Sequence, residues 1–175
     1  NVAFVSQSGG ILVDQMIKFT GQGVGMAKAV SVGNKALIGE KEMLAWLAQD
    51  PATKVIAFYV EGFGPGQGRE FVAAADACPK PVVIMKSGKT AAGNRAVSSH
   101  TASLAGDYAS FAAAMAQHNI IEAADERELV SFCEALSAYE RGIGRNIGII
   151  TGSGGHGAMA ADACAAAGLS TPSLS

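Results

Sequence analysis

The sequence is poor in charged residues, in aromatic residues and in cysteine, and these shortages exclude several classes of protein. Only 16% of the 175 residues are charged, the net charge is −2 and the basic residues are scattered, which argues against a nucleic-acid-binding surface. The three cysteines have neither the number nor the spacing of a disulfide framework or zinc site, so we expect no metal site and a reducing, cytoplasmic setting. No apolar run approaches the roughly 20 residues of a membrane span.

The sequence is instead rich in apolar residues, which make up 49% of it and indicate a folded, globular chain. It begins NVAFV, without Met and already inside an expected strand. We therefore expect it to be a piece of a longer protein.

Short apolar runs alternate with helical patterns along the first 140 residues. The expected strands are residues 2–6, 27–32, 54–60, 81–86 and 119–121, and the expected helices are residues 9–20, 40–49, 68–77, 107–118 and 125–138. The longer strands are apolar throughout, which is typical of parallel strands that are buried on both faces. Five β–α units in succession predict a flavodoxin-like, doubly wound α/β fold with the parallel strand order 2-1-3-4-5.

A sixth β–α unit follows a linker at residues 141–145. It comprises an expected strand NIGIIT (146–151), a turn GSGGHG and a helix that ends at Gly168. We assign residues 1–140 to the flavodoxin-like domain and residues 146–175 to the start of a second, truncated flavodoxin-like domain. The alternative is that this unit adds to the first sheet.

Three connections converge on the ligand-binding edge of the predicted sheet. In an open parallel sheet, ligands bind outside the carboxyl ends of the strands, near the point where the strand order reverses. The first strand leads into Ser8-Gly9-Gly10 at a helix start, which suits an anion, although Ser8 as an ordinary N-cap is an alternative. The third strand delivers Glu61, and the fourth leads into a 21-residue connection (86–106) that carries His100 among small residues.

His100 and Glu61 are residue types that can act as a nucleophile and as the acid that orients it. An imidazole with a pKa near ~6.5 is largely neutral at cytoplasmic pH, so one ring nitrogen of His100 can attack while the other donates to an orienting acid. Glu61 is the candidate for that acid, in the manner of a catalytic triad carboxylate. Hydroxyl groups at Ser98, Ser99, Thr101 and Ser103 keep a hydrolase open as an alternative.

The turn GSGGHG also fits the dinucleotide-binding pattern G-x-G-x-x-G, through Gly152, Gly154 and Gly157. That pattern is weak on its own, because the acidic residue that should follow about 20 positions later lies beyond the end of the sequence. The turn is better evidence for a second phosphate-receptive helix start. His156 within it and His118 at a helix end are more simply interpreted as structural or incidental.

The segments SQSGG, SVGNK, YVEGF, KSGKTAAGNRAVSSHTASLAG and TGSGGHGAMAADACAAAGL occur here in an order and spacing that resemble the NDP-forming acyl-CoA synthetases. The similarity is to the α part of ADP-forming acetyl-CoA synthetase, which is related to succinyl-CoA synthetase. It covers essentially the whole chain, and SSHTASLAG is its most specific element.

The resemblance implies a ligase that works through a phosphohistidine. His100 matches the histidine that receives a phosphoryl group from acyl phosphate and passes it to a nucleoside diphosphate, and Glu61 matches the carboxylate that binds this histidine. Ser8-Gly9-Gly10 and Ser153-Gly154-Gly155 match the two helix starts that hold the phosphohistidine. In one departure, His156 stands where the family commonly has proline, which puts the rigidity of that turn in doubt.

The resemblance also implies partners that the sequence does not contain. A CoA-binding Rossmann domain and an ATP-grasp domain or subunit would bind CoA, ATP or ADP with Mg²⁺, and phosphate, and the whole would be an oligomer. Two other functions stay open. One is a non-catalytic regulatory or ligand-sensing module of a protein acetyltransferase fusion, against which the presence of His100 and Glu61 argues. The other is a free-standing flavodoxin-like binder of small molecules.

Overall fold

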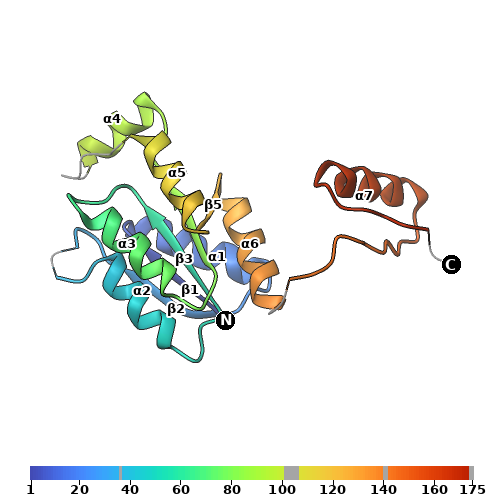
Figure 1. The fold of residues 1–175 in the computed structure, drawn as a ribbon, viewed down its shortest axis with the longest axis horizontal. Coiled ribbons are helices and arrows are strands. Elements are labelled where there is room, and N and C mark those ends of the chain that lie inside the picture. The colour runs from blue at the N-terminus through green and yellow to red at the C-terminus, as the bar shows by residue number, and fades with distance from the viewer. Residues whose placement is uncertain (36, 101–106, 140–141, 174–175) are drawn as a thin grey trace. The chain divides into compact units, whose positions relative to one another are not determined.

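The chain divides into two compact units, Asn1–Ala138 and Tyr139–Ser175. The computed structural model describes residues 1–35, 37–100, 107–139 and 142–173, except for the side chains of residues 98–100. The elements are β1 (Val2–Ser6), α1 (Gly9–Gly21), β2 (Met26–Ser31), α2 (Glu40–Gln49), β3 (Val55–Val60), α3 (Gln67–Asp76), β4 (Val82–Lys86), α4 (Ala91–His100), α5 (Tyr108–Gln117), β5 (Ile121–Ala123), α6 (Glu126–Ala138) and α7 (Gly154–Ala166). All but α7 belong to the first unit (Figure 1).

The first unit is built on a five-stranded parallel sheet with the order β2-β1-β3-β4-β5. Strand β1 lies between β2 and β3, and its Val5 pairs with Val30 on one side and with Phe58 on the other. Every residue of β1, β3 and β4 is buried, because helices cover both faces of the sheet. The predicted flavodoxin-like fold and its strand order are therefore confirmed.

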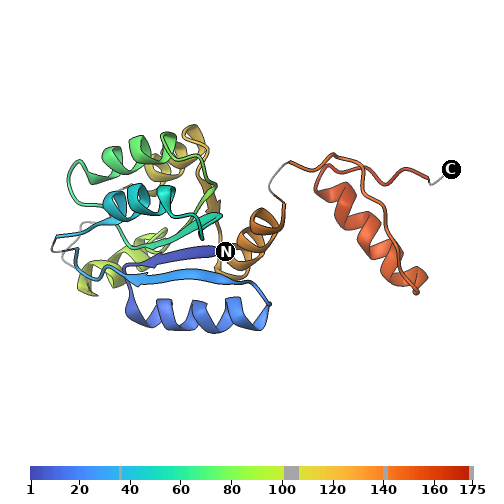
Figure 2. The same cartoon turned by 90° about the horizontal axis from the view of Figure 1, so that it is seen from below.

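Side chains that alternate along each strand supply two cores, one on each face of the sheet. One face packs against α1 and α6, where the rings of Phe4 and Phe19 lie 6.1 Å apart. The other face packs against α2, α3 and α5, where Phe58 meets Phe71 edge-on at 5.1 Å. Figure 2 shows this layering edge-on, with α1 below the strands and α2 and α3 above them.

Within the first unit, the expected boundaries hold closely, apart from that of the last strand. Residues 119–121 were expected to form it, but β5 is Ile121–Ala123. The reason is the end of α5, where Asn119 adopts a left-handed conformation (φ 54°) and the amide of Ile120 donates to Met115. This C-terminal helix motif uses Asn119 and Ile120, so the strand begins only after it.

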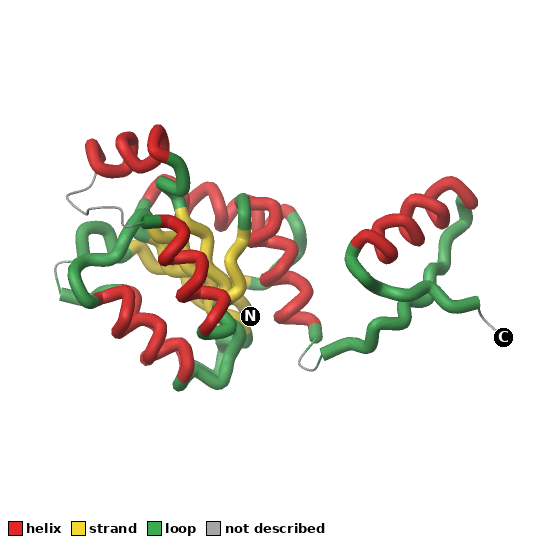
Figure 3. Tube along the Cα trace, turned by 45° about the horizontal axis from the view of Figure 1, so that its top comes forward, coloured by secondary structure: helices red, strands yellow, loops and turns green. Residues whose placement is uncertain are grey.

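The sequence predicted that the connection after β4 is a loop throughout. In the structure, residues 91–100 of this connection form helix α4. The Thr90 hydroxyl accepts a hydrogen bond from the Gly93 amide at 3.1 Å, which is an N-cap interaction. Val97 is buried and packs against Gly88, whose φ of +74° favours glycine. Helix α4 lies beyond the carboxyl ends of the strands and outside the helical layers (Figures 1 and 3).

The second unit departs from the prediction at its expected strand, NIGIIT. Among residues 142–173 the pairing is confined to one parallel bridge, between Asn146 and Ser170, so residues 146–151 do not form a strand. The physical reason is the lack of a partner: Ile150 is 98% exposed, whereas the equivalent residues of β1 are paired on both sides. The expected helix is present as α7, which ends before Gly168 in a left-handed turn (φ 69°). The assignment of this unit to a second flavodoxin-like domain stays a prediction.

Candidate functional site

Glu61 directly follows β3 at the carboxyl edge of the sheet, and its side chain is largely buried, with 6% of the residue exposed. The Tyr59 hydroxyl lies 3.4 Å from Glu61 Oε1 and donates to the Ser87 hydroxyl at 3.0 Å. Burial raises the pKa of Tyr59, and the nearby Glu61 charge adds to the rise, while the bond to Ser87 opposes it. Tyr59 therefore stays protonated at neutral pH and lies beside the carboxylate as an uncharged hydroxyl.

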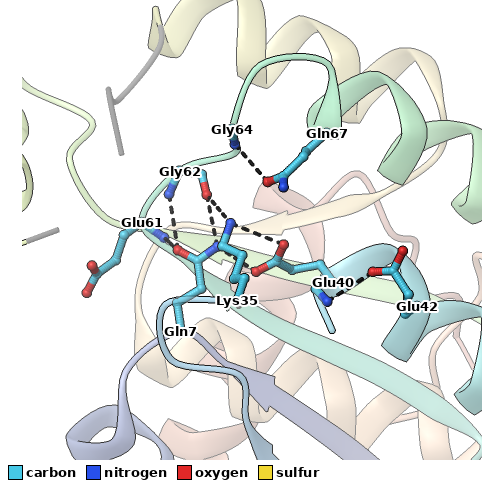
Figure 4. Close-up of polar contacts among 9 residues, drawn as sticks. Gln7, Lys35, Glu40, Glu42, Glu61, Gly62, Gly64 and Gln67 are labelled. Carbon is cyan, nitrogen blue, oxygen red and sulfur yellow. Dashed lines mark hydrogen bonds and ion pairs between the residues drawn. The ribbon is translucent and has the colours of Figure 1, made fainter. Parts of the chain in front are cut away.

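The main chain at Glu61 and Gly62 is enclosed by side chains from other segments (Figure 4). Gln7, which follows β1, accepts hydrogen bonds from the amides of Glu61 at 2.6 Å and Gly62 at 3.2 Å. Lys35, which follows β2, donates to the Gly62 carbonyl at 2.8 Å and pairs with the buried Glu40 at 3.2 Å. The Glu61 side chain points away from this cluster in Figure 4, so its carboxylate is not part of it.

Lys86 closes the same turn from the end of β4. Its ammonium group is buried and donates to the carbonyls of Glu61 and Ser87, each at 2.7 Å. Burial lowers the pKa of Lys86, and the charges of Glu122 and Glu61 oppose that shift. The lysine thus ties β4 to the residue that carries the carboxylate.

A cavity of about 570 Å³ opens at this edge, beside Tyr59. Its lining joins the carboxyl ends of β3 and β4 to the start of α6, and consists of Ile11, Tyr59, Met85, Lys86, Ser87, Ala124, Asp125, Glu126 and Arg127. Its volume lies within the range of about 300–1,000 Å³ that is typical of small-molecule sites. The position is the ligand edge that the predicted topology indicates.

A second cavity, of about 440 Å³, lies between α3 and α5. Apolar side chains dominate its lining, among them Phe63, Val72, Phe111 and Met115, with Lys86 and Arg69 as its cations. It suits an apolar ligand better than the transfer of a phosphoryl group, which needs charged and hydrogen-bonding groups around the reacting atoms.

The Ser8-Gly9-Gly10 turn begins α1 at the same edge. Ser8 is the N-cap residue, and its hydroxyl accepts from the Ile11 amide at 3.4 Å. Gly9 and Gly10 are exposed, and their amides belong to the first turn, where helix N–H groups have no partner within the helix. The turn has the character of an anion site, and its binding of phosphate stays a prediction.

The Ser153-Gly154-Gly155 turn begins α7 in the second unit. Ser153 has extended backbone angles at the N-cap position, and both glycines and the following His156 are exposed. Among the described residues, its hydroxyl makes no capping hydrogen bond. Its role as a second phosphate-binding turn stays a prediction.

His100 is the last residue of α4, which lies beyond the carboxyl ends of the strands. Its side chain, like those of Ser98 and Ser99, is outside the described part of the molecule, as are residues 101–106. The pairing of His100 with Glu61 therefore stays a prediction. His118 bonds to Asp76 at 2.7 Å, as a bridge between α5 and α3.

Four residues that contact Glu61 or Gly62 were not predicted as site residues, namely Gln7, Lys35, Tyr59 and Lys86. Their common signal is position: each lies within a few residues of the carboxyl end of a strand, where side chains of neighbouring strands meet. In the described ranges, no three His, Cys, Asp or Glu residues are grouped so as to hold a metal ion. Among the described helices, none is long and apolar enough to cross a membrane.

Comparison with known proteins agrees with this architecture. Residues 1–136 match the family model described as "Succinyl-CoA ligase like flavodoxin domain". The chain is 45% identical over 163 residues to acetate–CoA ligase [ADP-forming] I of Archaeoglobus fulgidus, covering 93% of this chain and 24% of that protein. It is 35% identical over 174 residues to acetate–CoA ligase [ADP-forming] II subunit alpha of Pyrococcus furiosus, covering 99% of this chain and 38% of that subunit.

The structure is also similar to that of dinucleotide forming acetyl-coenzyme A synthetase 1 of Ca. Korarchaeum cryptofilum, solved in complex with phosphate and ADP. The TM-score is 0.88 at 35% identity, and the match covers 100% of this chain and 38% of that one. The chain thus spans between about a quarter and two fifths of the length of these relatives.

Proposed function

The chain belongs to the succinyl-CoA-ligase-like flavodoxin domains, and on that basis we propose that it is the phosphohistidine-bearing part of an ADP-forming acyl-CoA synthetase. The main support is the similarity, over nearly its whole length, to proteins named as ADP-forming acetate–CoA ligases. Further support comes from Glu61 and α4, which both lie at the carboxyl edge of the sheet.

In the proposed reaction, phosphate attacks acyl-CoA to give acyl phosphate and free CoA. A ring nitrogen of His100 then attacks the phosphorus atom, the bond from phosphorus to the acyl oxygen breaks, and the carboxylic acid leaves as its carboxylate. Finally ADP attacks the phosphohistidine, which releases ATP and regenerates His100. Phosphoryl transfer of this kind depends mainly on positioning and charge stabilisation, which a histidine at the end of a helix beside a rigid sheet edge can supply.

Glu61 would act as the orienting carboxylate of this reaction. It would accept a hydrogen bond from the ring nitrogen of His100 that does not react, and so fix the tautomer and stabilise the charged ring. The protonated Tyr59 hydroxyl, 3.4 Å from Glu61 Oε1, supports this role because it restricts the carboxylate from one side.

The two glycine turns would hold the phosphoryl group. Ser8-Gly9-Gly10 at the start of α1 and Ser153-Gly154-Gly155 at the start of α7 each present the positive end of a helix dipole. A doubly charged phosphoryl group is stabilised at such a position by the N–H groups of the first helical turn.

The other substrates would bind elsewhere in the complete enzyme. The relatives are much longer than this chain, and one is named as a subunit alpha, which supports further domains or subunits. We assign the binding of CoA to a Rossmann domain and of ATP or ADP with Mg²⁺ to an ATP-grasp domain or subunit. The assembly would be an oligomer in the cytoplasm.

The test is phosphorylation of the complete enzyme that contains this chain. After incubation with Mg²⁺ and ATP labelled in its γ-phosphate, we expect an acid-labile phosphoryl group on His100 that is discharged by carboxylic acid and CoA. The His100→Asn variant should bind nucleotide and stay folded, but take no label. A folded, nucleotide-bound wild-type enzyme without a phosphoryl group on His100 would overturn the proposal in favour of the regulatory module.

A further inference from the structure

The main chain that carries Glu61 is held by side chains at all four of its polar atoms, counting those of Glu61 and Gly62. Gln7 Oε1 accepts from both amides, Lys86 donates to the Glu61 carbonyl, and the Gly62 carbonyl accepts from Gln7 Nε2 at 2.9 Å and from Lys35 at 2.8 Å. Because β3 ends at Val60, this turn has left the sheet ladder. Side chains therefore replace the ladder as its support.

Gln7 makes the most bonds in this arrangement, and its amide can serve in only one orientation. Its oxygen faces two N–H donors, while its nitrogen faces two acceptors, the Gly62 carbonyl and Glu40 Oε1 at 2.7 Å. A flipped amide would set donor against donor and acceptor against acceptor. The hydrogen bonds therefore determine which end of the Gln7 amide is the oxygen and which is the nitrogen. The site requires one acceptor and one donor group on the same side chain.

Glu40 completes the cluster from the first residue of α2. It is 3% exposed, and its two oxygens bond separately to Gln7 and Lys35. Lys35 has a left-handed backbone (φ 56°), which is uncommon for a residue with a long side chain and persists only where surrounding contacts hold it. The three side chains thus form one unit that joins β1, β2 and α2 to the turn at Glu61 (Figure 4).

We propose that Gln7, oriented by Glu40, is a positioning residue that sets the direction of the Glu61 carboxylate for its work on His100. This inference rests on the proposed function and deepens it. Gln7 touches no reacting atom; it acts through the main chain of Glu61. A small rotation of that main chain would swing the carboxylate away from the imidazole, and misplacements of about 1 Å can cost roughly 100-fold in rate.

The decisive variant is Gln7→Glu, which keeps the size of the side chain. The new carboxylate still accepts from both amides, but its other oxygen faces the Gly62 carbonyl and the Glu40 carboxylate, where Gln7 donates at 2.9 and 2.7 Å. In the complete enzyme, we expect the single-turnover rate of His100 phosphorylation by ATP to fall roughly 10- to 100-fold. The KM for ATP should not change, because this chain is not proposed to bind the nucleotide.

Gln67→Glu is the matched control. Gln67 also accepts from a main-chain amide of the loop after β3, that of Gly64 at 2.9 Å, and the substituted carboxylate would keep this bond. The same chemical change six residues from Glu61 should leave the phosphorylation rate at its wild-type value. A fall equal to that of Gln7→Glu would mean that any new charge in this loop slows the enzyme, and would overturn the inference.

Two double variants separate positioning from damage to the fold. In Gln7→Glu with Glu40→Gln, the charge is exchanged between the two side chains, so the new amide donates to the new carboxylate and the pairing with Lys35 is kept as an amide–ammonium contact. We expect part of the lost rate to return, because the exchange restores the contact with residue 40 while the new carboxylate still faces the Gly62 carbonyl. In Gln7→Glu with Glu61→Gln, the loss should be little greater than that of Glu61→Gln alone, because both changes act through one carboxylate.

The outcomes distinguish the inference from the function beneath it. If the wild-type enzyme takes no phosphoryl group on His100, the proposed function and the positioning role of Gln7 are both wrong. If it does, and Glu61→Gln is slow while Gln7→Glu is as fast as wild type, the function stands and the positioning role is wrong. A charge-exchanged variant as slow as Gln7→Glu, with an unchanged thermal midpoint, would likewise overturn the role of Gln7.

Discussion

The turns that begin α1 and α7 share their local geometry and differ in almost everything around them. In each, a hydroxyl two residues before the N-cap serine accepts from the serine amide, Ser6 to Ser8 at 3.0 Å and Thr151 to Ser153 at 3.1 Å. In each, the serine carbonyl also accepts from the amide four residues later, at 3.0 Å. The N-cap backbone angles agree within about 15°.

Their surroundings are not alike. Ser6 is fully buried and ends a strand that is paired on both sides, whereas Thr151 is exposed and follows residues that form no strand in the described part of the second unit. Helix α1 buries Gln15 and Phe19, while α7 buries none of its residues. The local sequence therefore determines the geometry of the turn. Whether the helix that follows becomes part of a core depends on a sheet against which it can pack.

The largest expected difference between the two helices is in stability. Phe19→Ala in α1 removes a fully buried ring from its contact with Phe4, and we expect a loss of roughly 3–5 kcal/mol in the free energy of unfolding. Met159→Ala in α7 removes a side chain that is 69% exposed, so the change should stay within about 0.5 kcal/mol.

Urea unfolding of the chain measures this difference. The fluorescence of the single tryptophan, Trp46 in α2, reports on the first unit, and helical circular dichroism reports on both units. A loss below about 1 kcal/mol for Phe19→Ala would contradict the packing of α1 on the sheet, since even a favourably relaxed aromatic deletion costs more.

The next difference concerns phosphate. Gly9→Asp and Gly154→Asp would each place a carboxylate at a helix start, where it stabilises the helix but repels an arriving phosphoryl group. Both sites have room, since a Cβ at Gly9 would lie 3.9 Å from the Ser31 hydroxyl and one at Gly154 would meet nothing within 4 Å. We expect each variant to slow His100 phosphorylation in the complete enzyme roughly 10- to 100-fold.

Asparagine at the same positions is the control, because it has the size of aspartate without its charge. The asparagine variants should stay within a few-fold of the wild-type rate. A Gly154→Asp enzyme as fast as wild type would remove the α7 turn from the phosphate site, and leave the α1 turn to hold the phosphoryl group without it.

Sequence reasoning succeeded where local pattern and burial coincide. The bounds of β1 were predicted to the residue, because the apolar run VAFV follows a polar residue and leads through Ser6 into a glycine turn. Glu61 was placed at the correct sheet edge for the same reason, since the apolar run of β3 ends immediately before it.

Predictions from the sequence failed where contacts between distant segments determine the local structure. NIGIIT has the same pattern as β1 but lacks neighbours, so residues 146–151 do not form a strand. Helix α4 was missed because Gly93, Ser98 and Ser99 are typical of loops, although Thr90 three residues before Gly93 was a readable capping signal. That Gln7 would reach Glu61, 54 residues away, follows from the register of β1 on β3, which no local pattern contains.

The smallest expected difference lies in the caps themselves, and it tests how far the likeness of the two turns extends. Ser8→Ala removes an acceptor for the Ile11 amide and should cost about 1 kcal/mol in the free energy of unfolding, measured by urea with Trp46 fluorescence. The Ser153 side chain makes no capping bond among the described residues, so Ser153→Ala should leave the helical circular dichroism of the chain and its urea midpoint unchanged. An equal loss at both serines would mean that the Ser153 hydroxyl caps α7 in solution, and the two turns would then be alike in energy as well as in shape.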